Sequence, residues 1–236
     1  ACIIFAAFGI RQSMGLFMRP ISDGLGWGRE ILSLALATQN LLIGFAAPFF
    51  GAIADRWGPP KTLAVGGLLF SVGLLLMSLA STPFVMFMSA GVMMGIGLGA
   101  CGMPLVLATV SKVAPEQKRS LWIGIITTCG TGGQLLLVPV SRLAIGELGW
   151  PASLLVLSII AMLIVPIALA TSSAITKDTG KDNNINIREA LREAFYHRGY
   201  RLLTSGFFVC GFHVSFVAIQ LPAFVHDRCA EPGLGA

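Results

Sequence analysis

The residue that stands out first in this chain is Arg11, a charged side chain inside an otherwise apolar run. On a helix it would lie about 12 Å along the axis from Arg19. An arginine held at mid-membrane depth costs at least ~2.5 kcal/mol unless it faces water or a partner. Because a guanidinium can hold a carboxylate through two parallel hydrogen bonds, Arg11 is a candidate binding group for an anion. The alternative is a structural arginine bonded to neighbouring helices.

His213 is a second candidate inside an apolar run. A histidine changes charge near neutral pH, so it can bind the same anion or carry protons; a neutral histidine bonded within its bundle is equally consistent. Asn40 and Gln134 are further candidate ligands, although hydrogen bonding between helices also explains such residues. The chain has no nucleophile beside a base, no paired carboxylates and no metal-ligand spacing. We therefore predict no enzyme activity, no cofactor and no metal site.

Membrane helices must position these residues. Of the 236 residues, 55% are hydrophobic and only 11% charged, and the mean hydropathy is +0.82. A soluble domain carries roughly a quarter charged residues, so a soluble enzyme, a disordered tail and a secreted disulfide scaffold are excluded. Residues 62–111 carry no charge and are too long for one crossing, so we expect a turn at Pro83. The predicted helices cover residues 1–22, 31–54, 61–80, 83–111, 119–145, 150–172 and 199–225.

Lysine and arginine placement predicts the orientation, because these residues accumulate in cytoplasmic loops. The loops that follow the second, fourth and sixth helices hold most of them, including Arg56, Lys61, Lys118 and Arg119. The N-terminus is therefore predicted to be cytoplasmic, in a multi-pass protein of the inner (plasma) membrane. This asymmetry accounts for the net charge of +5, so no nucleic-acid partner is inferred.

The first and last predicted helices share a pattern at a constant offset of 202 residues. The matching positions are Phe5, Gly9, Ser13 and Pro20 with Phe207, Gly211, Ser215 and Pro222, and Arg11 is paired with His213. Apolar helices also resemble one another by chance, but two parallel halves are a common transporter plan. We predict a six-helix bundle over 1–172, a cytoplasmic linker over 173–198, and the first helix of a second bundle with its outer loop over 199–236. The linker contains either a short amphipathic helix on the lipid headgroups or an ordinary solvated segment.

Two local patterns predict how helices pack and turn. Gly91, Gly95 and Gly99 recur every four residues, a spacing that lets helix backbones approach closely, and Pro104 can kink the same helix. Between the second and third helices, Gly51 is expected to permit close helix approach, and Gly58 is expected to permit a tight turn. The Asp55 side chain can cap the helix that follows.

The segment that holds Gly51, Asp55, Arg56, Gly58 and Lys61 resembles the loop between the second and third helices in the major facilitator superfamily. In that pattern a glycine is followed by an aspartate, a basic residue, a second glycine and further basic residues; Pro60 stands here where a basic residue is usual. The resemblance implies an all-α membrane fold in which these five residues belong to a gating loop. It also implies that the helices carrying Arg11 and His213 line a central pathway, and that the chain is a fragment of a twelve-helix transporter.

Two passages are similar to the monocarboxylate branch of that superfamily, which includes bacterial oxalate/formate exchangers. They are Lys118-Arg119 with Leu121, Gly124 and Gly130, and the segment around Gly211-Phe212-His213 and Leu221-Pro222-Ala223-Phe224. The acidic-glycine-aromatic signature of the animal carriers is absent, and so is the glycine-proline-glycine-glycine pattern of drug/proton antiporters.

The resulting hypothesis is a secondary transporter that moves a small organic anion, a monocarboxylate, by alternating access in the lipid bilayer, with protons as a candidate coupling ion. Arg11, His213, Asn40 and Gln134 are its predicted substrate-binding residues. One alternative is an exporter of drugs or other small solutes from the same superfamily. Another is a membrane sensor that binds a ligand without translocating it.

Overall fold

The computed structural model describes residues 1–113 and 115–170, together with the helical residues 196, 198–199, 201–202, 205–206, 209 and 211. The chain divides into two compact units, residues 1–179 and 180–236. In the described ranges every regular element is a helix, which confirms the predicted fold class. The predicted helix over 199–225, and His213 within it, lie largely outside the described residues.

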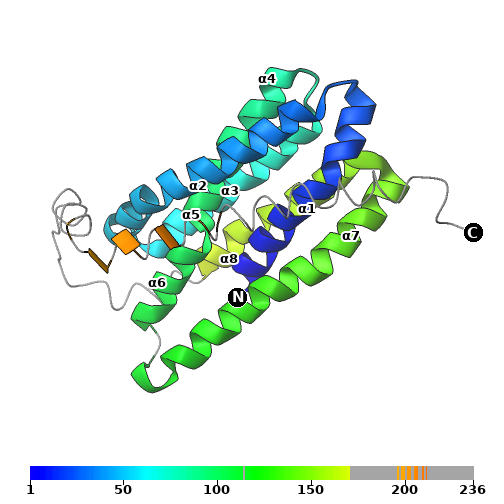
Figure 1. The fold of residues 1–236 in the computed structure, drawn as a ribbon. Coiled ribbons are helices and arrows are strands. Elements are labelled where there is room, and N and C mark those ends of the chain that lie inside the picture. The colour runs from blue at the N-terminus through cyan, green and yellow to red at the C-terminus, as the bar shows by residue number, and fades with distance from the viewer. Residues whose placement is uncertain are drawn as a thin grey trace, which may run out of the picture. The chain divides into compact units, whose positions relative to one another are not determined.

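The first unit begins with three long helices, α1 (Cys2–Leu25), α2 (Arg29–Trp57) and α3 (Pro59–Ser78) (Figure 1). The next span consists of α4 (Pro83–Met86), the π-helix η1 (Phe87–Met93), α5 (Met94–Cys101) and α6 (Met103–Val113). A short 3-10 turn, η2 (Glu116–Lys118), leads to α7 (Arg119–Met162) and α8 (Ile164–Ala170). These bounds agree with the six predicted helices to within a few residues.

Helix α7 contains two of those predicted helices, because its path breaks at Gly149. The φ of Gly149 is 77° and its ψ is 168°, a backbone conformation that side chains with a Cβ rarely adopt. Beyond the break the chain runs back along α3, where Ser71 contacts Ser158 and Gly67 lies against Ile164. Gly149 therefore separates a fifth span from a sixth.

The contact registers give an up-and-down bundle. Helix α1 and the first arm of α7 run parallel, since Gly9 lies against Gly133 and Gly24 lies against Trp150. Helices α1, α3 and α7 consequently begin at one end of the bundle, here called the Gly58 end. The opposite end, where α1 finishes and α7 breaks, is the Gly149 end. Figure 1 shows α1 lying beside α7.

Backbone contact between α1 and α7 depends on two glycines. A Cβ on Gly133 would overlap the carbonyl group of Phe5, and a Cβ on Gly9 would lie 2.6 Å from the carbonyl oxygen of Gly133. Contacts this short leave no space for any side chain. The two helices can therefore approach this closely only because both positions lack a Cβ atom.

The predicted glycine stripe packs as expected, against α2. A Cβ on Gly91 would lie 3.2 Å from the carbonyl oxygen of Ala35, and one on Gly99 would lie 2.6 Å from the Cβ of Ala46. A neighbouring face of α5 meets α3, where a Cβ on Gly97 would lie 2.7 Å from the backbone nitrogen of Phe70. Helix α5 is therefore enclosed on two sides at backbone distance.

The predicted interruption of this span near Pro104 is present, but it lies two residues earlier, at Gly102. Gly102 has φ −71° and ψ 173°, so it is extended between α5 and α6. Pro104 is then the second residue of α6, a position where its missing N–H would have had no helical acceptor. The proline thus begins a new helix instead of kinking a continuous one.

Hydroxyl groups complete the packing inside the bundle. Ser71 Oγ donates to the Ser158 carbonyl oxygen at 2.9 Å, and Ser158 Oγ donates to the Ser71 carbonyl oxygen at 3.0 Å. In η1, Ser89 Oγ donates to the carbonyl oxygen of Val85 at 2.7 Å. In an apolar interior such bonds satisfy groups that water cannot reach.

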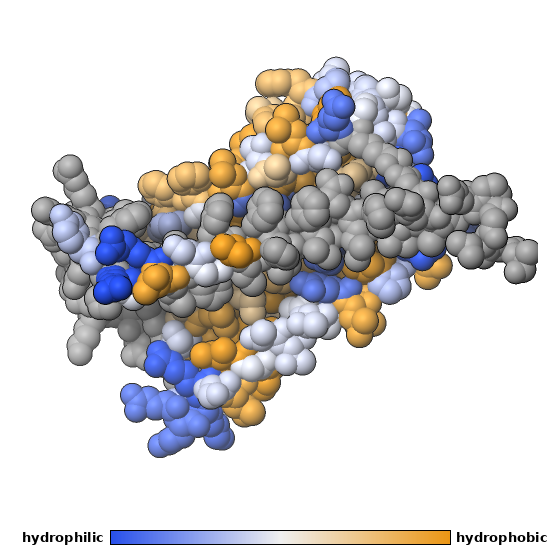
Figure 2. All heavy atoms as spheres, viewed as in Figure 1, coloured by the Kyte–Doolittle hydropathy of each residue, from blue (hydrophilic) through white to orange (hydrophobic). Residues whose placement is uncertain are grey.

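The outward faces of the bundle are apolar. Leu34, Leu41, Phe45 and Phe49 on α2 are each more than 60% exposed. Within the described ranges, four segments are long and apolar enough to cross a membrane: Glu30–Trp57, Pro59–Ser78, Pro83–Ser111 and Glu116–Ala170. Figure 2 shows hydrophobic residues along the helices and hydrophilic residues gathered where α6 meets α7. This is a multi-pass membrane protein.

Substituting Gly133 with alanine should destabilise the bundle, because the new methyl group overlaps the Phe5 carbonyl on α1. Overpacking of this kind costs about 1–3 kcal/mol. The matched control is Gly132→Ala, since nothing lies within 4 Å of a Cβ at Gly132. Thermal unfolding of the full-length protein in detergent should give a lower Tm for Gly133→Ala and an unchanged or higher Tm for Gly132→Ala. Equal Tm values for the two variants would contradict the contact.

Candidate functional site

The structure brings Arg11 and Asn40 together. Arg11 is half-buried on α1, and its Nη2 donates a hydrogen bond of 2.5 Å to Oδ1 of Asn40 on α2. Asn40 Nδ2 in turn donates to the carbonyl oxygen of Leu36 at 3.0 Å, which fixes the orientation of the amide. The guanidinium is thus held by a neutral acceptor. Its positive charge is not cancelled by this partner, and most of its five N–H donors remain for other contacts.

Sequence reasoning gave no preference to Gln39, the residue before Asn40, although its environment is unusual. Gln39 is only 2% exposed, and its Nε2 has no hydrogen-bond partner among the described residues. The backbone carbonyl oxygen of Gln39 lies where α2 meets Gly95 of α5. A buried donor without a partner costs about 1–3 kcal/mol, so a water molecule or a ligand is the expected acceptor. Sequence gave no signal that distinguished Gln39 from the other polar residues.

Gln134 is half-buried on the first arm of α7. It follows Gly133, which contacts Phe5 and Gly9 of α1. No hydrogen bond joins Gln134 to Arg11 or Asn40 among the described residues. The structure therefore places Gln134 on a helix adjacent to Arg11 without joining the two, and His213 lies outside the described residues.

The predicted gating loop lies at the Gly58 end, with Asp55, Arg56 and Lys61 exposed. Gly58 has φ 88° and ψ 142° and is the N-cap of α3, which confirms the expected tight turn. Thr62 Oγ1 supports that turn by donating to the carbonyl oxygen of Gly58 at 3.2 Å.

The expectation that Gly51 permits close helix approach is wrong for the described bundle. Nothing among the described residues lies within 4 Å of a Cβ at Gly51, so close packing against its own bundle does not require a glycine there. The side chain at this position would point into open space.

Basic side chains gather at the same end of the bundle. Lys118 at the end of η2 and Arg119 at the start of α7 are exposed like Arg56 and Lys61. The bundle topology therefore places two of the three basic loops that the orientation argument used on one side, and the third, after the sixth helix, lies largely outside the described residues. Arg142, by contrast, lies within α7 toward the opposite end, seven residues before the break at Gly149.

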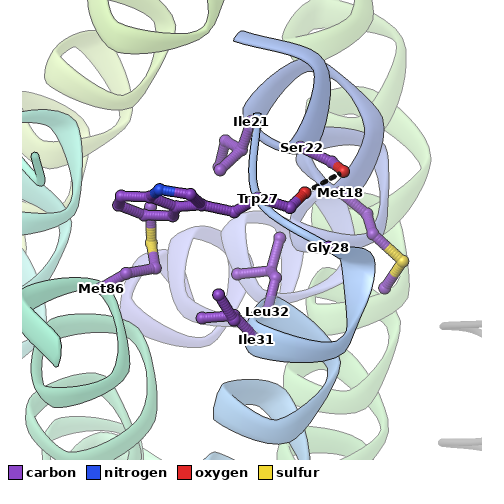
Figure 3. Close-up of a pocket in the computed structure, with 8 residues that line it drawn as sticks. All are labelled: Met18, Ile21, Ser22, Trp27, Gly28, Ile31, Leu32 and Met86. Carbon is purple, nitrogen blue, oxygen red and sulfur yellow. Dashed lines mark hydrogen bonds between the residues drawn. The ribbon is translucent and has the colours of Figure 1, made fainter. Parts of the chain in front are cut away.

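A small hollow near the Gly149 end has a different character (Figure 3). It is lined mainly by apolar side chains, including Met18 and Ile21 of α1 and Met86 of α4. Figure 3 shows the indole of Trp27 directed toward Met86. The lining hydroxyl, Ser22 Oγ, already donates to the Trp27 carbonyl oxygen at 2.6 Å. This hollow offers no charge to an anion, so it is not the predicted site.

An apolar helical bundle with a charged residue held inside one helix and a basic loop at one end is the construction of a membrane transport protein. The profile of the Major Facilitator Superfamily matches residues 1–232. The chain therefore belongs to the Major Facilitator Superfamily, a family of transporters and not of enzymes.

Named relatives agree with the predicted branch. Monocarboxylate transporter 11 of Homo sapiens is 29% identical over 164 residues, which cover 68% of this chain and 34% of that protein. The uncharacterized MFS-type transporter YcxA of Bacillus subtilis (strain 168) is 24% identical over 229 residues, which cover 92% of this chain and 54% of that protein. The chain thus spans about a third to a half of these relatives.

Among solved structures, the fold is similar to a crystal structure of the peptide transporter POT in complex with alafosfalin. The TM-score is 0.62 at 16% identity, covering 96% of this chain and 47% of that chain. At this identity the likeness establishes the fold alone.

Replacing Asn40 with alanine removes the acceptor that holds the Arg11 guanidinium. Because hydrogen bonds to charged groups contribute about 1.5–3 kcal/mol, the Tm of the full-length protein should fall clearly in thermal unfolding. Gln12→Ala, on the exposed neighbour of Arg11, is the control and should change the Tm little. Asn40→Asp keeps the acceptor for Arg11 but loses the Nδ2 donor to the Leu36 carbonyl oxygen, so its Tm should fall less than that of Asn40→Ala. An unchanged Tm for Asn40→Ala would show that the bond contributes nothing.

Proposed function

We propose that the whole protein is a secondary transporter of a small organic anion, in particular a monocarboxylate. The observation that carries this proposal is the state of Arg11: a half-buried guanidinium within a membrane helix whose described partner is the neutral amide of Asn40. A fixed cation held by an uncharged group favours an anionic ligand as its counter-charge. Relatives named monocarboxylate transporters support the same substrate class.

The geometry suggests how the carboxylate would be held. Asn40 occupies one donor of the guanidinium, which leaves an N–H pair on the planar fork for the two carboxylate oxygens. Gln134 on α7 and the donor of Gln39 would contribute neutral contacts. His213, paired with Arg11 by the 202-residue offset, would bring the second half of the molecule to the same ligand.

Alternating access follows from two halves that enclose one site. We assign residues 1–172 to the first bundle, 173–198 to the linker and 199–236 to the opening helix of the second bundle. The Gly58 end, with Arg56, Lys61 and Arg119 exposed, would face the cytoplasm of a plasma-membrane protein. There Asp55 and Arg56 would act, with Gly51, Gly58 and Lys61, in the latch between the halves.

Replacing Arg11 with glutamine should abolish most transport, because the lost charge-assisted hydrogen bonds contribute about 1.5–3 kcal/mol. This corresponds to a fall of about 10- to 150-fold in kcat/KM. The measurement is uptake of labelled lactate by proteoliposomes that contain the full-length protein. Arg11→Lys should be intermediate, since lysine keeps the charge but not the planar fork.

Gln12→Ala is the matched control and should transport normally. Uptake that persists in Arg11→Gln would remove Arg11 from the site. If the wild type binds lactate but transports none, the protein is a membrane sensor. Transport of cationic or neutral drugs in its place would favour the exporter.

Proton coupling makes a separate prediction at His213. A histidine can gain a proton and a positive charge near neutral pH, so His213 would add positive charge at the site when it takes up a proton. An inward proton gradient should therefore stimulate wild-type uptake. His213→Gln should lose this stimulation while retaining exchange of labelled for unlabelled lactate. Stimulation of equal size in both proteins would exclude His213 as the proton carrier.

A further inference from the structure

The beginning of α7 carries basic and apolar side chains next to each other on the surface. Lys118 ends η2 and Arg119 is the first residue of α7, and both are exposed. Leu121, Trp122 and Ile125 follow within two turns, and each is more than 40% exposed. These five residues are here called the α7 tip. Figure 2 shows hydrophilic residues gathered at this point, with hydrophobic residues beside them.

The apolar side of the α7 tip continues along the helix as a strip. At 100° per residue, Ile125, Leu136 and Leu143 lie within about 20° of one another around α7, and each is more than 40% exposed. No charged residue of 121–146 lies within about 60° of the centre of this strip. The residues that α7 buries against α1, such as Ile126 and Gly130, are on another side of the helix. The strip therefore has the composition of a surface that faces acyl chains.

The length of the strip places the α7 tip at the depth of lipid headgroups. From Ile125 to Leu143 the strip measures about 27 Å along the axis, close to the ~30 Å hydrocarbon thickness of a bilayer. Lys118 lies about 10 Å before Ile125, in a headgroup layer that is about 5–8 Å thick on each side. Trp122 lies between them, and an indole prefers the boundary between hydrocarbon and headgroups. The charged and apolar parts of the surface thus follow the layers of one leaflet.

The charge at this end of the bundle favours an anion. Residues 56–141 contain a single acidic residue, Glu116, which lies on η2 two residues before Lys118. The exposed charged side chains described at the Gly58 end of the first unit are four basic and two acidic, namely Arg56, Lys61, Lys118 and Arg119 against Asp55 and Glu116. Basic side chains at headgroup depth are attracted to anionic lipids.

The occupant must match both parts of this surface. A free anion in water would be attracted by Lys118 and Arg119, but it would gain nothing from the apolar strip. A phospholipid with a net negative charge carries a phosphate group and acyl chains in one molecule. Its dimensions across one leaflet are those of the basic residues followed by the strip, so the surface fits a lipid better than a soluble anion.

We propose that the α7 tip binds an anionic phospholipid, with the headgroup phosphate at Lys118 and Arg119 and an acyl chain along the strip that begins at Ile125. The inference goes beyond the proposed function and does not depend on the transported substrate. In the proposed orientation the lipid belongs to the cytoplasmic leaflet, the one that carries anionic lipids.

The first test compares two lipids by their effect on stability. Full-length protein in a neutral detergent is titrated with phosphatidylglycerol or with phosphatidylcholine of the same acyl chains, and the Tm is followed. The concentration that gives half of the rise in Tm should be about tenfold lower for phosphatidylglycerol. In Lys118→Gln/Arg119→Gln the two concentrations should come close together. Lys118→Arg/Arg119→Lys keeps both charges and should keep the preference.

The matched control is Arg56→Gln/Lys61→Gln, which removes the same charge from the same end, leaves the α7 tip intact and should keep the preference. An equal loss in the two glutamine variants would overturn the proposal, since the preference would then belong to the whole basic end. Equal half-maximal concentrations for the two lipids in the wild type would also overturn it. So would a rise in Tm of the same size with inorganic phosphate, because the site would then serve free anions.

The second test locates the bound lipid. Phospholipids with brominated acyl chains quench nearby tryptophans, and in nanodiscs the part of the quenching that disappears in full-length Trp122→Phe is that of Trp122. This part should be larger with brominated phosphatidylglycerol than with brominated phosphatidylcholine at the same fraction of the bilayer. High salt should reduce the difference, because it screens exposed charges. Equal quenching of Trp122 by the two lipids would show that no anionic lipid is held at the α7 tip.

Discussion

A hydrocarbon environment offers neither hydrogen bonds nor solvation for charge, and this constraint governs every part of the first unit. It favours helices, because each helix satisfies its own backbone. It also forces polar side chains to find partners inside the bundle, as Ser71 and Ser158 do by donating to each other's carbonyl oxygens. Since apolar surfaces gain little by meeting one another in lipid, the helices are held by close backbone contact at positions such as Gly133.

The same constraint explains why the fold was largely predictable from sequence. Charged residues end the apolar runs, so they mark the helix ends, and the glycine spacing from Gly91 to Gly99 identified a packing face. Local geometry was harder to predict. The sequence suggested a kink at Pro104, but the extended residue that interrupts the fourth span is Gly102, two residues earlier. Pro104 causes no break because a proline fits well in the first turn of a new helix.

The site was predictable in its residue types and less so in its contacts. Arg11 stood out because a charge in an apolar run is costly, but no spacing rule indicated that Asn40 holds it, since the two lie 29 residues apart on different helices. The expected reason for Gly51 failed because a local pattern does not reveal which face of a helix meets a neighbour.

The π-helix η1 (Phe87–Met93) has a consequence for how this span tolerates changes in length. A π turn accommodates one residue more than an α turn while the helix on either side keeps its direction. Deleting one residue within η1 would convert the wide turn into an ordinary one and leave Gly95 and Gly99 facing α2. The same deletion in α5 would rotate the residues beyond it by about 100° and turn Gly99 away from Ala46. The extra residue thus confers a local tolerance to shortening that the rest of the span lacks.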